Sequence, residues 1–199
     1  ANYITHADLE PPFLCMLTSG GNTQIVYVKD YCDMEVLGRT RDDAIGEAFD
    51  KVARVIGLGY PGGPKIDKLA KEGKPTYKLP VPLKDDSYNF SFSGLKSAVI
   101  NLAHNEEQRG NKLNHEDLSA SFQKVAIESI TTKIKKAIVE KNIKTVIVAG
   151  GVAANQGLRA AMQEVADELN VDLSIPPMKY CTDNATMIAA AGYYAYLDG

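Results

Sequence analysis

Two glycine turns contain the residues of this sequence that are best suited to bind an anion through backbone groups. The first lies between Thr145 and Arg159, where an apolar run ends at Gly150-Gly151 and a helix-forming sequence follows, which predicts a strand, a turn and a helix. Without side chains at the turn, backbone N–H groups and the helix N-terminus can face a ligand, and the amide of Asn155 can hydrogen-bond a hydroxyl or a base edge. A βα turn without any ligand is the alternative.

The second glycine turn lies near the start of the chain. Two strand-forming runs within residues 13–29 flank the string SGGNT at 19–23, which predicts a β-hairpin. Hairpin turns favour Gly-Gly and Gly-Asn because these residues accept positive φ, so the turn requires no function. The hydroxyls of Ser19 and Thr23 beside two bare amides are also typical of an anion-binding nest. Together the two turns predict a nucleotide held between them.

The elements that must position these turns are predicted from hydrophobic spacing. A helix is indicated by apolar residues between Ile45 and Ile56, and Gly57 follows as a helix stop. A longer helix has a buried stripe made of Leu118, Phe122, Val125, Ile130, Ile134 and Ile138. The expected elements are a third strand at 34–37, helices at 42–56, 65–71, 116–141 and 185–196, a further helix opening at 90–96, and the strand at 145–149.

The order of these elements predicts the fold class. Three strands and a helix, followed by helix–strand–helix–strand–helix, fit an α/β protein with a mixed sheet and helices on its faces. The site is then expected at turns along one edge of that sheet. Residues 73–89 are rich in proline and charge, and residues 73–115 are expected to form a connector or an insertion. A Rossmann fold is disfavoured because both glycine turns lack GxGxxG and the chain opens with an antiparallel hairpin.

The composition excludes several classes of protein. With 199 residues and 45% hydrophobic content, the chain fits one large domain or two small ones. A net charge of −3 provides no overall basic field, so nucleic-acid binding requires a local patch or a partner. Three separated cysteines without a CxxC pair indicate reduced thiols. Because it has no signal-peptide pattern and no apolar run of about 18 residues, we expect a cytoplasmic protein with no membrane segment.

Six motifs, in order, carry a resemblance to a known family. They are SGGNT (19–23), DDAIGEAFDK (42–51), YPGGPKID (60–67), FSFSGLKSA (90–98), AGGVAAN (149–155) and CTDNA (181–185). With them the chain closely resembles the tRNA adenosine threonylcarbamoyltransferases, historically labelled O-sialoglycoprotein endopeptidases or glycoproteases. The resemblance implies an actin-like ATPase fold over residues 1–199, of the sugar kinase, chaperone ATPase and actin type. It implies mainly the C-terminal lobe, and part of the N-terminal lobe is expected to precede this chain, which begins without an initiator Met.

The resemblance also implies an activity and its partners. The family transfers a threonylcarbamoyl group from threonylcarbamoyl-adenylate to the adenosine adjacent to the anticodon of tRNA. The implied ligands are therefore an adenine nucleotide or threonylcarbamoyl-adenylate as substrate and tRNA as partner. Partner proteins of the modification complex, including a paralogous dimerisation subunit, are implied as well. The chain alone is expected to be inactive, because part of the nucleotide cleft would be missing.

The family's ligand contacts fall on the two glycine turns and on segments between them. The hairpin amides would cradle phosphate, Asp50 and Asp67 would accept from ribose or substrate hydroxyls, and Gly63 would let a sugar approach the backbone. From the residues alone, Asp43, Glu47 and Asp50 instead indicate a solvated acidic face paired with basic residues one helical turn away. The positions carried over are Leu17, Thr18, Ser19, Gly20, Gly21, Asp50, Gly63, Asp67 and Asn155.

Asp183 falls on the family's carboxylate metal ligand, and the implied metal is one divalent ion, iron or zinc. The residues by themselves favour a helix N-cap at this position. The resemblance places two histidines, four apart on a helix, just upstream of Ala1 as further ligands. His6, His104 and His115 are isolated in the sequence and are expected to be surface histidines.

Other functions stay open at this point. The sequence departs from the family at Asn22, where a histidine is usual, so the hairpin loses a titratable group. Ser19, Cys15 and Cys181 have no neighbouring base in a readable pattern, which argues against a covalent nucleophile. The alternatives are a non-catalytic nucleotide-binding scaffold, a small-molecule kinase of the same superfamily, and a metalloprotease, although HExxH is absent. Lysines within 133–141 are predicted to form a solvated helix face.

Overall fold

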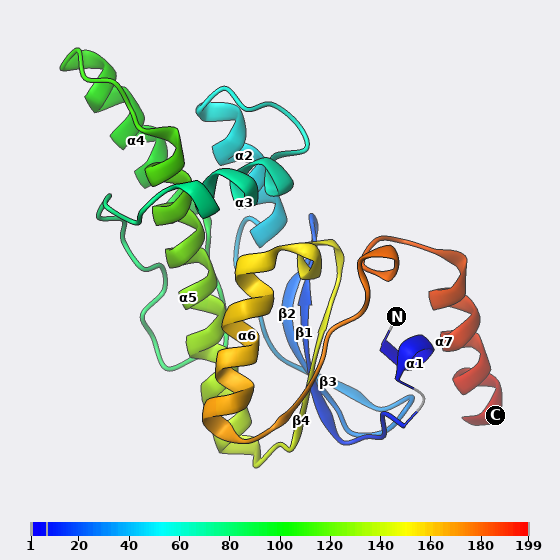
Figure 1. The fold of residues 1–199 in the computed structure, drawn as a ribbon. Helices are drawn as coiled ribbons and strands as arrows, with labels where there is room; N and C mark the ends of the chain where they lie inside the picture. Colours follow the sequence, from blue (N-terminus) through cyan, green and yellow to red (C-terminus); the bar gives the residue numbers. More distant parts are fainter. Residues whose placement is uncertain (1, 7, 199) are drawn as a thin grey trace.

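The computed structural model describes residues 2–6 and 8–198, which are built around a five-stranded sheet (Figure 1). The strands are β1 Phe13–Thr18, β2 Thr23–Val28, β3 Met34–Arg39, β4 Thr145–Ala149 and β5 Asp172–Ser174. Their order in the sheet is β3-β2-β1-β4-β5. β1 pairs antiparallel with β2 and parallel with β4, β2 pairs antiparallel with β3, and β4 pairs parallel with β5. The predicted mixed sheet is confirmed.

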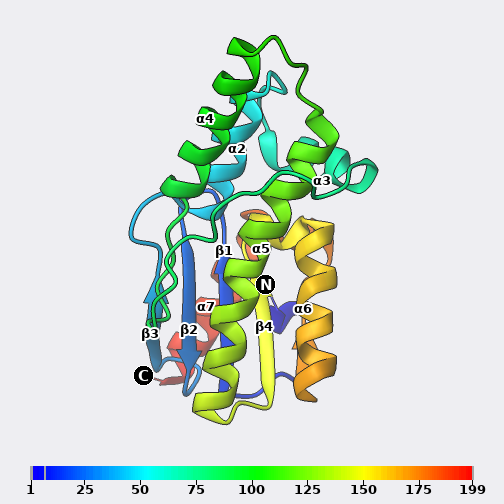
Figure 2. The ribbon, with the colours of Figure 1, turned by 90° about the vertical axis from the view of Figure 1, so that its left-hand side faces the viewer.

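Helices cover both faces of this sheet. They are α1 Asn2–Thr5, α2 Ile45–Val55, α3 Gly62–Glu72, α4 Ser93–Gln108, α5 His115–Lys141, α6 Gln156–Leu169 and α7 Ala185–Asp198, with 3₁₀ turns η1 Gly151–Ala154 and η2 Met178–Tyr180. Figure 2 shows α5 and α6 side by side on one face, with α7 behind the strands. The helices α2, α3 and α4 lie beyond one end of the strands, next to the glycine turns (Figure 1).

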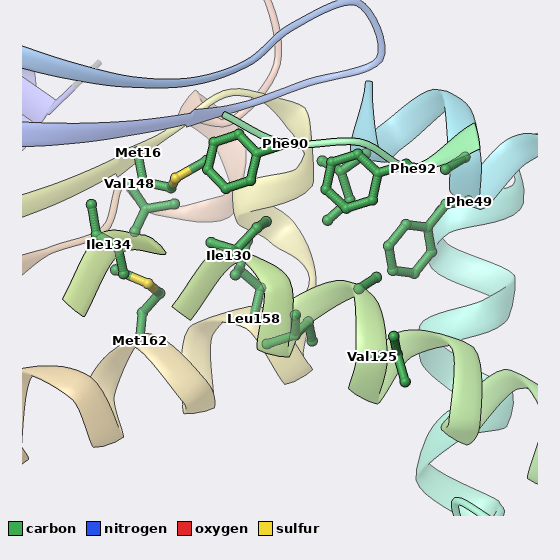
Figure 3. Packing of buried hydrophobic residues seen from close by; sticks show 14 of the residues in the cluster. Met16, Phe49, Phe90, Phe92, Val125, Ile130, Ile134, Val148, Leu158 and Met162 are labelled. Carbon is green, nitrogen blue, oxygen red and sulfur yellow. The ribbon is translucent and has the colours of Figure 1, made fainter. Parts of the chain in front are cut away.

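The main hydrophobic core lies between the sheet and α5. All six residues of the predicted α5 stripe are buried. In Figure 3, Ile134 of α5 lies between Val148 of the sheet and Met162 of α6. Nearer the N-terminus of α5, Phe122 packs edge-on against Phe49 of α2, with 5.0 Å between the ring centroids. One helix therefore anchors the sheet at one end and the α2–α3 pair at the other.

The structure extends or shifts several predicted helix boundaries. The long helix α5 agrees closely with its prediction, because Asn114 caps its start by accepting from Asp117 N (2.8 Å) and Asn142 ends it in the left-handed conformation. Helix α3 begins at Gly62, earlier than predicted, and the N–H of Gly62 finds a partner in the carboxylate of Asp50 (2.7 Å). That carboxylate belongs to another helix, so no local signal marked this helix start.

Helix α2 begins at Ile45 and not at the predicted Asp42, because Asp42 serves another helix. Its carboxylate accepts hydrogen bonds from the N–H groups of Phe92 (2.7 Å) and Ser93 (3.1 Å) at the start of α4, and from Ser91 Oγ (2.5 Å). Burial raises the pKa of Asp42, but these hydrogen bonds outweigh burial and the pKa lies below its ordinary value. Asp42 thus ties α4 to the segment that leads into α2.

Replacing Asp42 by asparagine is expected to lower the free energy of unfolding by about 0.3–1 kcal/mol at neutral pH, because the start of α4 loses a negative charge. A carboxylate with a lowered folded-state pKa stabilises the fold above its unfolded pKa, and this contribution disappears as pH falls through the folded pKa. The difference between wild type and Asp42→Asn should therefore shrink below about pH 4. Urea unfolding at neutral and acidic pH measures it, with the exposed Asp172→Asn as control. An equal difference at both pH values would contradict the capping role.

Residues 73–92 contain no helix and no strand, and they lie against α5. The carboxylate of Asp117 on α5 accepts from the N–H of Lys74 (2.8 Å). Lys133, also on α5, is 7% exposed, and its ammonium donates to Asp85 Oδ1 (2.9 Å). The prediction of a solvated lysine face is wrong at Lys133, because this segment covers it. The expectation that the region forms a connector or an insertion stays a prediction.

Cysteines and histidines agree largely with expectation. All three cysteines are free thiols. His104 and His115 are exposed, as predicted, whereas His6 is partly buried. Across residues 2–6 and 8–198, every helix is too short or too polar to span a membrane.

Candidate functional site

A cavity of about 500 Å³ lies where the two glycine turns meet α2 and α3. Five of the predicted contact residues line it: Gly20 from the hairpin, Asp50 from α2, Gly63 and Asp67 from α3, and Asn155 from the turn after β4. These residues come from four segments that lie far apart in the sequence. The structure brings them to one edge of the sheet, at the carboxyl ends of β1 and β4, where sites in such folds are expected.

The hairpin turn satisfies its own polar groups. Ser19 Oγ accepts hydrogen bonds from the N–H groups of Gly21 (3.3 Å) and Asn22 (2.9 Å). Thr23 is fully buried, and its hydroxyl oxygen accepts from Ile45 N at the start of α2 (2.9 Å). Neither glycine of the turn has a positive φ. The N–H of Gly21 and both hydroxyls thus have partners within the protein, and Gly20 is the residue of the turn that lines the cavity. The anion-binding nest stays a prediction.

Leu17 and Thr18 end β1 and position the second turn, outside the cavity lining. Leu17 pairs with Ala149 in the parallel β1–β4 register, and Thr18 Oγ1 donates to the carbonyl of Ala149 (3.3 Å). Gly150 follows with φ +94°, and a Cβ there would lie 2.2 Å from the carbonyl oxygen of Thr18. The close approach of the two turns therefore requires glycine at position 150.

Asp50 connects α2 to the start of α3. Its Oδ1 accepts from Gly62 N (2.7 Å), and the residue also borders the cavity. From the sequence alone, the acidic residues of this segment were expected to pair with neighbouring basic residues. Asp43 and Glu47 do so, because a carboxylate oxygen of each lies 2.8 Å from Lys51 Nζ. Asp50 has a different partner, which sets its carboxylate apart from this charged face.

Asp67 is a buried carboxylate that faces the N-terminus of α6. It accepts from the N–H groups of Gln156 (3.2 Å) and Gly157 (3.4 Å), and Lys71 Nζ lies 3.8 Å away. Carboxylates are favourable at helix N-termini because free N–H groups and the helix dipole stabilise negative charge. The prediction that this helix N-terminus is free for a ligand is wrong, because the protein caps it with its own carboxylate.

Asn155 is the N-cap of α6. Its Oδ1 accepts from Leu158 N (2.8 Å), and its Nδ2 donates to Gln123 Oε1 (2.8 Å). Only 8% of the residue is exposed. The amide was predicted to hydrogen-bond a ligand. Its oxygen and one N–H are used within the protein, so the prediction now concerns the second N–H of the amide. Gly151 and Val152 of the turn, which have no polar side chain, also line the cavity.

Two lysines and a glutamine lie in or beside this cavity, a place that the sequence did not indicate for them. Lys68 and Lys71 of α3 line the cavity and bring positive charge to the side that Asp67 occupies. Lys71 follows Asp67 by four residues, a spacing that places two side chains on the same helix face and could have indicated it. Gln123 is buried next to Phe122 of the α5 stripe, and no sequence pattern distinguished it from a core-edge residue.

Comparison with known proteins assigns the chain to a family. The model of the family described as TsaD, tRNA N6-adenosine threonylcarbamoyltransferase, matches residues 1–190. The chain belongs to the TsaD family. It is 56% identical over 194 residues to the tRNA N6-adenosine threonylcarbamoyltransferase of Bacillus thuringiensis (strain Al Hakam), covering 96% of this chain and 57% of that protein. The protein of the same name from Clostridium botulinum (strain 657 / Type Ba4) is 51% identical over 201 residues, covering 100% and 59%.

The chain thus spans less than two thirds of the length of these TsaD relatives. Among solved structures, full-length HypF in its phosphate- and nucleotide-bound form matches with a TM-score of 0.74 at 14% identity, over 100% of this chain and 35% of HypF. Component A of the (R)-2-hydroxyglutaryl-CoA dehydratase of Acidaminococcus fermentans matches at 0.50 and 15% identity, over 89% and 57%. Both similarities concern the fold alone, and they confirm the actin-like ATPase fold.

A divalent metal is the remaining expectation for a TsaD chain. Asp183 is exposed and follows Thr182, which lines the cavity. The N-cap of α7 is Asn184, whose Oδ1 accepts from Met187 N (3.2 Å), so the alternative of an N-cap at Asp183 is wrong. Within residues 2–6 and 8–198, His, Cys, Asp and Glu side chains form no group of three that could hold a metal ion. The described residues do not by themselves fit a metal site.

Proposed function

We propose that the protein transfers a threonylcarbamoyl group from threonylcarbamoyl-adenylate to the adenosine adjacent to the anticodon of tRNA. The observation that carries this proposal is the cavity in which Gly20, Asp50, Gly63, Asp67 and Asn155 meet. These are the positions at which the resemblance placed ligand contacts, and they converge in a chain that matches the TsaD family over residues 1–190. A volume of about 500 Å³ lies within the usual range of small-molecule sites.

The lining residues support an adenylate as the ligand. Asp50 uses one oxygen for the N–H of Gly62, and its carboxylate borders the cavity where it can accept from a ribose hydroxyl. A Cβ built at Gly63 meets no atom within 4 Å, so the backbone there is open to a sugar. Lys68 and Lys71 supply the positive charge that a phosphate requires. In this proposal the hairpin contributes through Gly20 alone.

The chemistry is a direct transfer. The N6 amine of the adenosine attacks the carbamoyl carbon, an N–C bond forms, the C–O bond to phosphate breaks, AMP leaves with the electron pair, and the amine loses a proton. Positive charge from Lys68 and Lys71 stabilises the negative charge that develops on the leaving phosphate. A covalent enzyme intermediate finds no support, because Ser19 Oγ is engaged within its turn and Cys181 is 2% exposed.

A divalent ion, iron or zinc, is part of this proposal, with Asp183 as one ligand. The carboxylate of Asp183 is exposed one residue after Thr182, which lines the cavity. Such an ion would serve as a Lewis acid. A single carboxylate holds a transition metal poorly, so the remaining ligands must come from elsewhere in the active protein.

Transfer to tRNA is proposed to require partner proteins, among them a paralogous dimerisation subunit, in a cytoplasmic setting. This chain carries a net charge of −3. On α3, Lys65 Nζ donates to Leu58 O (2.7 Å), and Lys68 and Lys71 line the nucleotide cavity. Few cations are left on this helix for tRNA phosphates.

We therefore expect the 199-residue chain alone to bind tRNA with a dissociation constant weaker than about 1 μM near physiological salt, because affinity scales with the number of phosphates neutralised. A filter-binding titration at increasing salt measures this. A small, strongly basic protein, which binds tRNA through its positive charge, serves as the positive control for the assay. Submicromolar binding with a steep salt dependence would contradict the expectation and indicate a basic surface that acts without partners.

The function is tested by incubating the protein and its complex partners with tRNA and threonylcarbamoyl-adenylate. Mass spectrometry of the digested tRNA should show threonylcarbamoyladenosine, and AMP should appear in equal amount. Nucleotide binding without tRNA modification would instead support a non-catalytic scaffold. Phosphorylation of a small molecule by ATP would support a kinase, and cleavage of a glycoprotein would support the historical protease label.

A further inference from the structure

Gln123 is a buried polar residue of α5 that links two of the site residues. It is 7% exposed. Its Nε2 donates to Asp67 Oδ1 (3.2 Å), and its Oε1 accepts from Asn155 Nδ2 (2.8 Å). One side chain from α5 thereby connects α3 to the turn that follows β4. The mechanism proposed above does not use it.

The orientation of this amide is set from both ends. A carboxylate can only accept, so the NH₂ group of Gln123 must face Asp67. At the other end, the N–H of Leu158 donates to Asn155 Oδ1 (2.8 Å), so the NH₂ group of Asn155 must face Gln123. Each amide therefore has one arrangement that satisfies every bond in the chain of contacts.

These bonds close into a ring at the first turn of α6. The ring begins at the N–H of Leu158, passes through Asn155, Gln123 and Asp67, and returns to α6 through the N–H of Gln156 (3.2 Å). The carboxylate of Asp67 and the amide of Asn155 are thus both held by the first turn of α6. Removal of any member leaves a buried polar group without its partner, which is costly.

The packing around Gln123 leaves room for this amide. A Cβ at Gly157 would lie 2.6 Å from Gln123 Nε2 and 3.1 Å from Ile127 Cδ1. Glycine at position 157 therefore allows α6 to approach α5 closely enough for the ring to form. This is a second observation, independent of the hydrogen bonds, that the position of Gln123 is closely defined.

We propose that Gln123 is a positioning residue of the nucleotide site, which holds Asp67 and Asn155 in the geometry that binds the adenylate. The inference rests on the proposed function. Gln123 itself lies outside the cavity lining, so it acts through its two neighbours. If Gln123 had only a structural role, replacing it would lower the free energy of unfolding. The affinity for AMP would then not depend on whether the side chain at position 123 can donate a hydrogen bond.

The decisive variant is Gln123→Glu, which keeps the shape and removes the donor to Asp67. At pH 7.5 two carboxylates would face each other, and we expect the affinity for AMP to fall roughly 10- to 100-fold. Burial and the charge of Asp67 raise the pKa of the introduced carboxyl, so it should protonate and donate again as the pH is lowered towards about 5.5. The ratio of variant to wild-type affinity should then recover by about tenfold or more.

The surroundings of the introduced carboxyl bear on this titration. Lys71 lies 3.8 Å from Asp67 on α3, and Lys124 and Glu128 of α5 line the neighbouring groove with Gln123. Gln123→Met provides no donor and no titratable group, and its sulfur is only a weak acceptor. Its loss of affinity should therefore be the same at both pH values, which separates the titration of the introduced carboxyl from that of these neighbours. Gln163→Glu is the matched control, since Gln163 is exposed on α6 and bonds only to Asp167 (2.9 Å) among the described residues.

Calorimetry with AMP on the protein in its active form, at both pH values, gives the result. Should Gln123→Glu not fold alone, the double variant Asp67→Asn/Gln123→Glu restores a donor and an acceptor in reversed order and is expected to bind AMP at least tenfold better than Asp67→Asn alone. Wild-type affinity in Gln123→Glu and Gln123→Met, or a loss in Gln123→Glu that does not recover at low pH, would overturn the positioning role. If the expected pattern is seen without tRNA modification, the proposed function fails and the positioning role stands. If tRNA is modified and the variants bind AMP as wild type does, the proposed function stands and the positioning role fails.

Discussion

The Asp50→Asn variant is expected to bind AMP roughly 10- to 100-fold more weakly than wild type while keeping its fold. Asparagine retains an oxygen for the N–H of Gly62, which Asp50 Oδ1 accepts at 2.7 Å. It replaces the other carboxylate oxygen by an NH₂ group, which cannot accept from a ribose hydroxyl. A hydrogen bond to a charged group contributes about 1.5–3 kcal/mol, and about 1.4 kcal/mol corresponds to tenfold in affinity.

Calorimetry with AMP measures the affinity, and urea unfolding shows whether the fold is retained. Asp172→Asn removes an exposed carboxylate on β5, away from the cavity lining, and should bind as wild type. Unchanged affinity in Asp50→Asn would sink the role of this carboxylate in nucleotide binding. A large loss of stability would instead show that its bond to the start of α3 matters most.

Replacing Gly150 by alanine should be among the most destabilising single changes in the chain. The residue has φ +94°, and the new Cβ would lie 2.2 Å from the carbonyl oxygen of Thr18 and 3.3 Å from Ser19 Cβ. With ψ 170°, the backbone lies in a region that essentially only glycine occupies, and a residue with a Cβ is strained there by about 1–3 kcal/mol. Overpacking adds about 1–3 kcal/mol. We expect the free energy of unfolding to fall by roughly 2–6 kcal/mol, a large part of the stability of a typical domain.

Gly21→Ala is the matched control for this experiment. Gly21 lies in the other glycine turn, its φ is not positive, and a Cβ there meets nothing within 4 Å. We expect its stability to lie within about 1 kcal/mol of wild type. Urea unfolding of both variants decides the matter. Equal stabilities would mean that the two turns do not depend on close backbone approach at Gly150.

Local patterns in the sequence were sufficient for most elements of the fold. The hairpin, the strand before Gly150 and the α5 stripe were predicted because period-2 and period-3.6 patterns report which face of an element is buried. The start of α2 was missed because Asp42 caps α4, whose first residues lie about 50 positions later, since 92 − 42 = 50. Such a cap leaves no signature in neighbouring residues.

The candidate site divides in the same way. The family resemblance that the six motifs carry implied Gly20, Asp50, Gly63, Asp67 and Asn155 as contacts, and the fold places these five around one cavity. The assignment of their polar groups was less successful. Several N–H groups that were predicted to face a ligand are occupied, those of Gly21 and Asn22 by Ser19 Oγ and those at the start of α6 by Asp67 and Asn155.

The sequence by itself determined the fold class, the family resemblance and the positions that gather at the cavity, because hydrophobic period, turn chemistry and motif order are local properties of the chain. Only the tertiary structure decided which of those groups are left for a ligand. Buried donors and acceptors must find partners, and the partner that wins is the one nearest in space. For the first turn of α6 that partner is Asp67, 90 residues before Gly157 in the chain.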